Sequence, residues 1–280
     1  MGICGAVACG LNDFRISETL REPIRLEDYS AMRILVLNPN TSEPITERLA
    51  SAARRAAAPD TVIVPLTAQR GVPYIATRAE AQIGGAIALE MLAEHHRDVD
   101  AAIIAAFGDP GLFGARELFD LPVVGLAEAS MLTACMLGRR FAIVTFARAL
   151  GPWYEDCVDM HGLAGRCAGV RMLDESFVSV SDVQEENEDL LVKLANRAVT
   201  EDGADVIILG GAPLAGLADK VKDRIPVPVV DQMAAAVKQA EALVALGVRK
   251  ATAGTFRRPD AKPTIGIAKA LAERIEHRDK

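Results

Sequence analysis

The chain is poor in aromatic residues, has no surplus of positive charge and contains no apolar run as long as a membrane span. Aromatic residues make up 4% of its 280 residues, and the formal net charge is −7. The lack of a basic cluster argues against nucleic acid or an anionic membrane surface as a partner. The lack of about 20 consecutive apolar residues argues against a transmembrane helix. Hydrophobic residues, mainly Ala, Val, Ile and Leu, form 50% of the chain, which is typical of parallel sheets covered by helices.

Cysteine and histidine are also scarce, with five and four residues respectively. None of the cysteines forms a metal-type pair, and their spacing gives no disulfide framework. The sequence therefore predicts a reducing, cytoplasmic location and no metal site. His95 and His96 lie at a charged helix end, where solvated histidines are common. The cysteines are Cys4, Cys9, Cys135, Cys157 and Cys167.

Residues 100–112, DAAIIAAFGDPGL, contain the most informative motif of the chain. The apolar run 101–106 is too short for a helix and ends in turn residues, which predicts a buried strand. The glycines that follow allow the backbone to approach a ligand closely. Because ligands bind at the carboxyl ends of strands in open α/β sheets, the motif predicts part of a binding site.

The same pattern occurs a second time, at residues 203–216, GADVIILGGAPLAG. The segment LPVV follows the first copy and VPVV follows the second at nearly the same offset. RILVL precedes the first copy and FAIVT precedes the second. These parallels predict an α/β protein of two pseudo-symmetric lobes, each a parallel sheet flanked by helices, with a ligand cleft between them. We expect residues 32–130 and 232–280 to form the first lobe and residues 131–231 the second.

The remaining elements follow from periodicity and from helix-start signals. Thr41 or Ser42 is expected to cap the helix that begins at residue 43. Trp153 is interpreted as a packing residue. The predicted strands are 33–37, 61–66, 101–106, 123–125, 141–145 and 168–172, with two more near Val206 and Val229. The predicted helices are 43–57, 78–93, 115–119, 128–137, 183–201, 232–246 and 265–275, with one more that contains Trp153 and Tyr154.

NPNTS at residues 38–42, FGDPGL at residues 107–112 and the segment that begins at Gly203 resemble the hydantoin/allantoin racemase family, within the aspartate/glutamate racemase superfamily. The similarity covers residues 32–248. It implies cofactor-free racemisation, in which one cysteine thiolate removes the proton beside a carbonyl and a second thiol delivers a proton to the opposite face. Thiols suit both roles because their pKa is easily tuned.

The chain departs from that pattern at both cysteine positions, where Ala106 and Gly211 stand. Neither residue can move a proton, so the two-thiol mechanism is not possible as the sequence is written. Cys135, Cys157 and Cys167 lie elsewhere and are interpreted as structural. The resemblance implies that substrate oxygens are bound around Asn40, Thr41, Phe107, Gly108, Thr145, Gly211 and Ala212.

These features predict a cofactor-independent, hydantoin racemase-like isomerase acting on a small carbonyl compound, such as a hydantoin, ureide, lactam or dicarboxylate. We expect a divergent, thiol-free mechanism that uses water and groups such as Asp109, Tyr74 or Arg148. Asp109 is alternatively a residue that shapes its turn. A non-catalytic ligand-binding or regulatory protein that kept the cleft is the alternative, and deliberate removal of the thiols to trap a ligand is another. We expect a small-molecule substrate and a homo-oligomer.

Residues 1–31 do not resemble the rest of the chain and lack the pattern of a signal peptide. We interpret them as a disordered extension, or as the result of a start codon placed too early, with Met32 the natural first residue. A chain that starts at Met32 should therefore keep its thermal midpoint, because untethered termini contribute little to stability. Differential scanning calorimetry of both chains measures this directly. A clear drop in the midpoint would show that the segment packs on the core.

Overall fold

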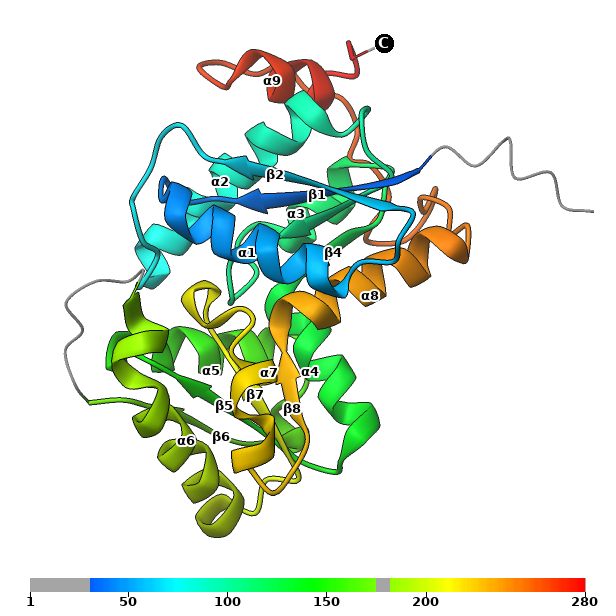
Figure 1. Ribbon diagram of the computed structural model, residues 1–280. Helices are drawn as coiled ribbons and strands as arrows, with labels where there is room; N and C mark the ends of the chain where they lie inside the picture. Colours follow the sequence, from blue (N-terminus) through cyan, green and yellow to red (C-terminus); the bar gives the residue numbers. More distant parts are fainter. Residues whose placement is uncertain (1–30, 175–181, 280) are drawn as a thin grey trace, which may run out of the picture. The chain divides into compact units, whose positions relative to one another are not determined.

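The computed structural model describes residues 31–174 and 182–279, which form two parallel four-stranded sheets (Figure 1). The predicted extension, residues 1–31, lies outside the described residues except for Ala31. The first sheet has the order β2-β1-β3-β4 and the second β6-β5-β7-β8. The strands are β1 (Met32–Asn38), β2 (Thr61–Thr67), β3 (Ala101–Ile104), β4 (Val123–Gly125), β5 (Phe141–Thr145), β6 (Cys167–Met172), β7 (Val206–Leu209) and β8 (Val229–Asp231).

Helices connect successive strands and cover the sheets, which confirms the predicted α/β class. Among the described helices, none combines the length and the apolar character that crossing a bilayer would need. The helices are α1 (Glu43–Ala56), α2 (Arg78–His95), α3 (Leu112–Leu118), α4 (Leu126–Leu137), α5 (Gly151–Met160), α6 (Val183–Asp202), α7 (Ala218–Val221), α8 (Gln232–Ala245) and α9 (Lys269–Ile275).

Most element boundaries agree with the sequence to within two residues, and the differences have local causes. Strand β3 ends at Ile104 rather than at residue 106, because Ala105 and Ala106 already lead into the turn. Helix α3 begins earlier than predicted, directly after Gly111 with its φ of 82°. Helix α9 begins later than predicted, after Gly266, whose φ of 72° is left-handed.

The two sheets repeat one strand order, since adding four to each strand number of the first gives the second. This agreement supports the inference from the repeated sequence pattern that the chain has two halves of similar design. Helix α8 follows β8 but packs on α1 and α4 and against β3 and β4, so the chain returns to the first sheet after completing the second. The domain limits and the two-fold relation between the lobes stay predictions.

Side chains of β1 alternate between two apolar clusters, as the two-residue period of a strand requires. Ile34 and Val36 belong to the larger cluster, which continues through the second sheet. Leu35 and Leu37 belong to a smaller cluster on the other face of the first sheet. The strands of a parallel sheet are buried on both faces in this way, which explains their continuous apolar runs.

A buried arginine fastens the C-terminal helix α9 to the first lobe. Arg274 is 4% exposed, donates to the carbonyl oxygen of Leu118 at 2.7 Å and forms ion pairs with Asp120 and Asp279. Its guanidinium also lies over the ring of Phe119. Burial alone would raise the pKa of Asp279, but hydrogen bonds from Arg274 and Arg258 outweigh it and lower the pKa to about 2.

Arg274→Ala should lower the free energy of unfolding by about 3 kcal/mol at pH 7, because it removes a buried charge and one of the two arginines that lie 2.7 Å from Asp279. The depressed pKa means that the contribution of Asp279 is present above pH ~4 and is lost as the pH falls towards 2. The difference between variant and wild type should therefore shrink in urea titrations between pH 6 and pH 3. Arg278→Ala, at an exposed arginine of the same segment, is the matched control and should cost little. An equally small loss for both would show that α9 is not held by Arg274.

Candidate functional site

The NPNTS segment forms a turn at the carboxyl end of β1, held by asparagine side chains. The amide nitrogen of Asn38 donates to Asn40 Oδ1 and to Thr46 Oγ1, both at 3.0 Å. Ser42 is the N-cap residue of α1, but its side chain forms no capping hydrogen bond, and its backbone N–H instead donates to Asn40 Oδ1 at 2.9 Å. The expected N-cap position at Ser42 is confirmed, but the expected hydroxyl hydrogen bond is absent, and Asn40 binds the backbone N–H of the cap residue instead.

The FGDPG turn follows β3 and contains three residues with positive φ, Gly108, Asp109 and Gly111. Gly108 has a φ of 108°, and a Cβ there would overlap the ring of Trp153. Asp109 has a φ of 52°, a conformation that aspartate tolerates better than most residues. The N–H of Asp109 donates to the carbonyl of Ala106 at 3.0 Å, which closes the turn.

The equivalent turn after β7 is held by a buried glutamine. Gln232, at the start of α8, accepts a hydrogen bond from the N–H of Gly211 at 3.2 Å and donates one to its carbonyl oxygen. Gly211 has a φ of 121°, and a Cβ at this position would lie 2.8 Å from Phe146 Cε1 and 3.3 Å from the hydroxyl of Tyr154. This backbone position therefore requires glycine.

A small cavity lies between the two turns, and Ala106 and Gly211 both line it. The volume of this cavity is ≈ 20 Å³, which is about enough for one water molecule. The first lobe contributes Asn40, Ile45, Tyr74, Ile75, Ala106 and Phe107, and the second contributes Phe146, Trp153, Tyr154, Gly211, Ala212 and Pro213.

Aromatic rings from both lobes meet around this cavity. Phe107 packs on Tyr154 with ring centroids 4.7 Å apart, and Tyr74 packs on Phe146 at 6.0 Å. Burial raises the pKa of both tyrosines well above its usual value, and the neighbouring Thr145 hydroxyl opposes this only partly for Tyr154. Both phenols are therefore neutral at neutral pH, so they can donate hydrogen bonds but cannot act as bases.

The structure brings together some of the predicted binding residues and separates others. Asn40, Tyr74, Phe107 and Ala212 line the cavity with Ala106 and Gly211. The other predicted residues do not line it. Thr41 is half-buried, Gly108 lies on a neighbouring surface hollow, Thr145 is fully buried, and Arg148 is exposed beside Asp174. Their roles in binding stay predictions.

Asp109 points away from the cavity and accepts hydrogen bonds from three groups. Its carboxylate oxygens accept from the backbone N–H groups of Ala127 and Glu128 at 2.9 and 2.8 Å, in the first turn of α4. His161 Nε2 lies 3.1 Å from Oδ2. The carboxylate thus satisfies free N–H groups at a helix start. These contacts favour the turn-shaping interpretation of Asp109, and a catalytic role stays an untested prediction.

His161 lies between two carboxylates and is almost fully buried. Its side chain is 3% exposed, and Nδ1 lies 3.5 Å from Glu128 Oε1. Burial alone would lower the pKa of His161, but hydrogen bonds to Asp109 and Glu128 outweigh it and raise the pKa to about 9. Glu128 in turn forms a salt bridge with Arg116, and its pKa falls to about 2 although burial alone would raise it.

Sequence reasoning missed Tyr154, Phe146 and Gln232 as parts of the site. Phe146 directly follows β5, the strand equivalent to β1, so its place at a carboxyl strand end was a usable signal. Tyr154 lies on α5 and Gln232 at the start of α8. Their proximity to the cavity depends on how these helices dock, which no local pattern records.

Two parallel α/β sheets whose strand-end turns border one small cavity define the architecture of the chain. Residues 34–240 match the model of the Asp/Glu/Hydantoin racemase family, and the chain belongs to this family. It is 36% identical to a hydantoin racemase of Pseudomonas sp. (strain NS671), over 84% of this chain and 95% of that protein.

Solved structures show the same relationship. An allantoin racemase from Klebsiella pneumoniae matches with a TM-score of 0.81 and 36% identity, over 86% of this chain and 98% of that one. The allantoin racemase from Pseudomonas fluorescens matches with a TM-score of 0.78 and 38% identity, over 84% of this chain and 100% of that one.

Gly211→Ala should be more destabilising than an alanine at another left-handed glycine, because it combines backbone strain with overlap. Gly203→Ala is the matched control, since Gly203 has a φ of 68° but no atom within 4 Å of the place that an alanine Cβ would take. We expect a loss of about 3 kcal/mol or more at Gly211 against about 1–2 kcal/mol at Gly203. Urea unfolding of the three proteins measures both. Equal losses would mean that Phe146 and Tyr154 yield freely to a side chain at position 211.

Proposed function

We propose that this chain is a cofactor-independent enzyme that acts on a small carbonyl compound of the cyclic ureide class without cysteine thiols. The observation that carries the proposal is that Ala106 and Gly211 line one cavity, each contributed by a different lobe. These are the positions at which the resemblance to hydantoin racemases expects the two cysteines. The names of the relatives, hydantoin racemase and allantoin racemase, support a ureide as the substrate class.

The polar groups of the cavity suit a carbonyl substrate. Asn40 uses its side-chain oxygen within the turn, so its amide nitrogen is the group that donates to a ligand. The phenols of Tyr74 and Tyr154 stay protonated and add two further donors. Fixed donors of this kind stabilise the negative charge that develops on a carbonyl oxygen when an adjacent bond to carbon or hydrogen breaks.

A proton acceptor is the missing part of this chemistry. Among the described residues that line the cavity, none carries a carboxylate, imidazole or thiol. We propose that a water molecule in the space left by the absent thiol side chains accepts the proton or attacks the carbonyl. A cyclic ureide is larger than the present cavity, so substrate binding requires the two aromatic-lined walls to move apart.

A substrate screen tests this proposal against the ligand-binding alternative. The panel consists of hydantoins, allantoin, lactams and dicarboxylates, with product analysis and solvent-deuterium exchange as readouts. We expect turnover of at least one cyclic ureide, unchanged after thiols are alkylated with iodoacetamide. Ligand-induced thermal stabilisation without any turnover would instead identify a binding protein, because a ligand of the native state alone raises stability.

Tyr154→Phe tests the phenol without disturbing the packing of its ring on Phe107. We expect kcat/KM for the identified substrate to fall by about 100-fold, the effect of removing one fixed donor to a developing oxyanion. The thermal midpoint should change little in comparison, and it serves as the control for folding. Unchanged kinetics in the folded variant would remove Tyr154 from the proposed site.

A further inference from the structure

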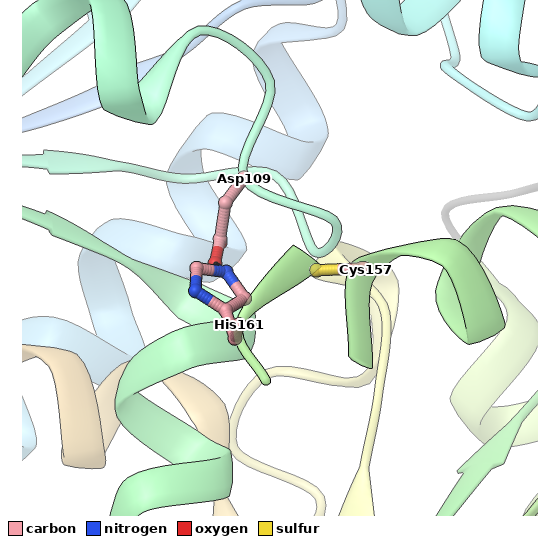
Figure 2. A group of neighbouring side chains, drawn as sticks. All are labelled: Asp109, Cys157 and His161. Carbon is pink, nitrogen blue, oxygen red and sulfur yellow. Dashed lines mark hydrogen bonds and ion pairs between the residues drawn. The ribbon is translucent and has the colours of Figure 1, made fainter. Parts of the chain in front are cut away.

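Three side chains of the kinds that bind transition metals converge behind the FGDPG turn (Figure 2). Asp109 comes from the turn after β3, Cys157 from α5, and His161 from the position just after α5. One ligand atom of each lies within 4.8 Å of the others. Figure 2 shows the imidazole of His161 against the Asp109 carboxylate, with the Cys157 sulfur directed to the same side of the helix.

We propose that Asp109, Cys157 and His161 bind a divalent transition-metal ion, with Zn²⁺ as the best match. Thiolate, imidazole and carboxylate are the three donor types that Zn²⁺ accepts in proteins, whereas Mg²⁺ and Ca²⁺ require oxygen ligands. Cys157 and His161 are four residues apart, so a helical turn places both on one face. Three protein ligands leave the fourth tetrahedral position to water.

The contacts around the three residues hold them as a metal site requires. Glu128 Oε1 lies 3.5 Å from His161 Nδ1, on the opposite side of the ring from the Nε2 that faces Asp109. A carboxylate in that position keeps the proton on Nδ1 and leaves the Nε2 lone pair for the metal. Arg116 fixes Glu128 through two guanidinium hydrogen bonds, and the N–H groups of α4 fix Asp109. The carboxylate–histidine arrangement of metal sites is therefore already built.

The cluster lies beside a surface hollow that is separate from the cavity between the lobes. Asp109 and Cys157 line this hollow of ≈ 520 Å³ together with Gly108 and Met160. The ring of Phe113 packs edge-on against His161 at 5.5 Å. Asp109 and Cys157 are 2% and 3% exposed, so an ion would enter from the hollow only when the residues that line it move apart.

Metal binding requires Cys157 as a thiolate and His161 with an unprotonated Nε2, so any protons on these two atoms would pass to solvent. Burial raises the pKa of the Cys157 thiol, so the charge of the metal ion itself would have to stabilise the thiolate. Cys157 is a free cysteine.

The proposed ion would join the two lobes. Asp109 belongs to the turn that carries Ala106 and Phe107, whereas Cys157 and His161 belong to the helix that carries Trp153 and Tyr154. Binding would tie the FGDPG turn to the C-terminal end of α5. The metal would act as a structural link at this end of the helix, and the opening of the cavity for substrate would have to come from its other walls.

The full-length protein, stripped with a chelator and dialysed, provides the direct test. Titration with Zn²⁺ should show one tight equivalent and a rise in thermal midpoint, because the ion binds the native state. Co²⁺ in its place should give a thiolate-to-metal absorption band. X-ray absorption of the Zn²⁺ form should show one sulfur at about 2.3 Å and nitrogen or oxygen at about 2.0 Å. Binding without a sulfur ligand, or no tight binding, would overturn the proposal and leave a buried ion pair.

Variants assign the ligands. Cys157→Ser should abolish the Co²⁺ charge-transfer band, and Glu128→Gln should weaken Zn²⁺ affinity about 10- to 100-fold through its effect on His161. Cys167→Ser, at a half-buried thiol of β6, and a Cys4→Ser/Cys9→Ser double variant are the controls and should keep the band. A band that survives Cys157→Ser would place the metal at another cysteine. The absorption data on the wild type decide the question even if a variant does not fold.

Discussion

The carboxylate of Asp109 is the point on which the arrangement of the site depends. It sits in a left-handed turn at the end of β3, accepts two N–H groups from the start of α4 and contacts His161 beyond α5. One side chain thereby connects the first sheet to helices on both sides of the lobe boundary. Gly125 is required beside it, since a Cβ there would overlap the Asp109 carboxylate. Because this charge is 2% exposed, its loss would leave several buried donors unpaired at once.

The fold was predictable because its signals are local and repeated. Apolar runs such as 141–145 end in turn residues, and the strands lie where those runs are. The repeated GG and FGDPG strand ends predict that positions 106 and 211 face one cleft, and both residues line the small cavity. What failed was the detail of the turns. Ser42 is the N-cap residue of α1, but its hydroxyl makes no capping hydrogen bond, and the Asn40 side chain instead accepts from the Ser42 N–H within the NPNTS turn.

The rest of the site was not predictable because it depends on contacts between elements distant in sequence. Asp109 and His161 are 52 residues apart, and Gly211 and Gln232 are 21 apart. A cysteine followed by a histidine four residues later was visible in the sequence, but its meaning depends on the carboxylate that the other lobe supplies. Tyr154 similarly reads as an ordinary helical residue until α5 is docked against Phe107. The sequence shows which side chains are present, but which of them meet in space depends on how the two lobes pack together.

Position 211, where the resemblance predicts a cysteine, has a backbone conformation that suits glycine. Its φ of 121° is a backbone conformation that a cysteine rarely adopts, and Gln232 holds both its N–H and its carbonyl in that orientation. A thiol restored there would displace Phe146 and turn the peptide against two hydrogen bonds. Ala106 has no such constraint, because it adopts no left-handed conformation and lies at the start of a turn. The two faces of the cavity therefore differ in the side chains that they can accept. A reaction that needs a catalytic side chain on each face would require a different backbone at Gly211. A reaction that needs a catalytic side chain only on the Ala106 face would not.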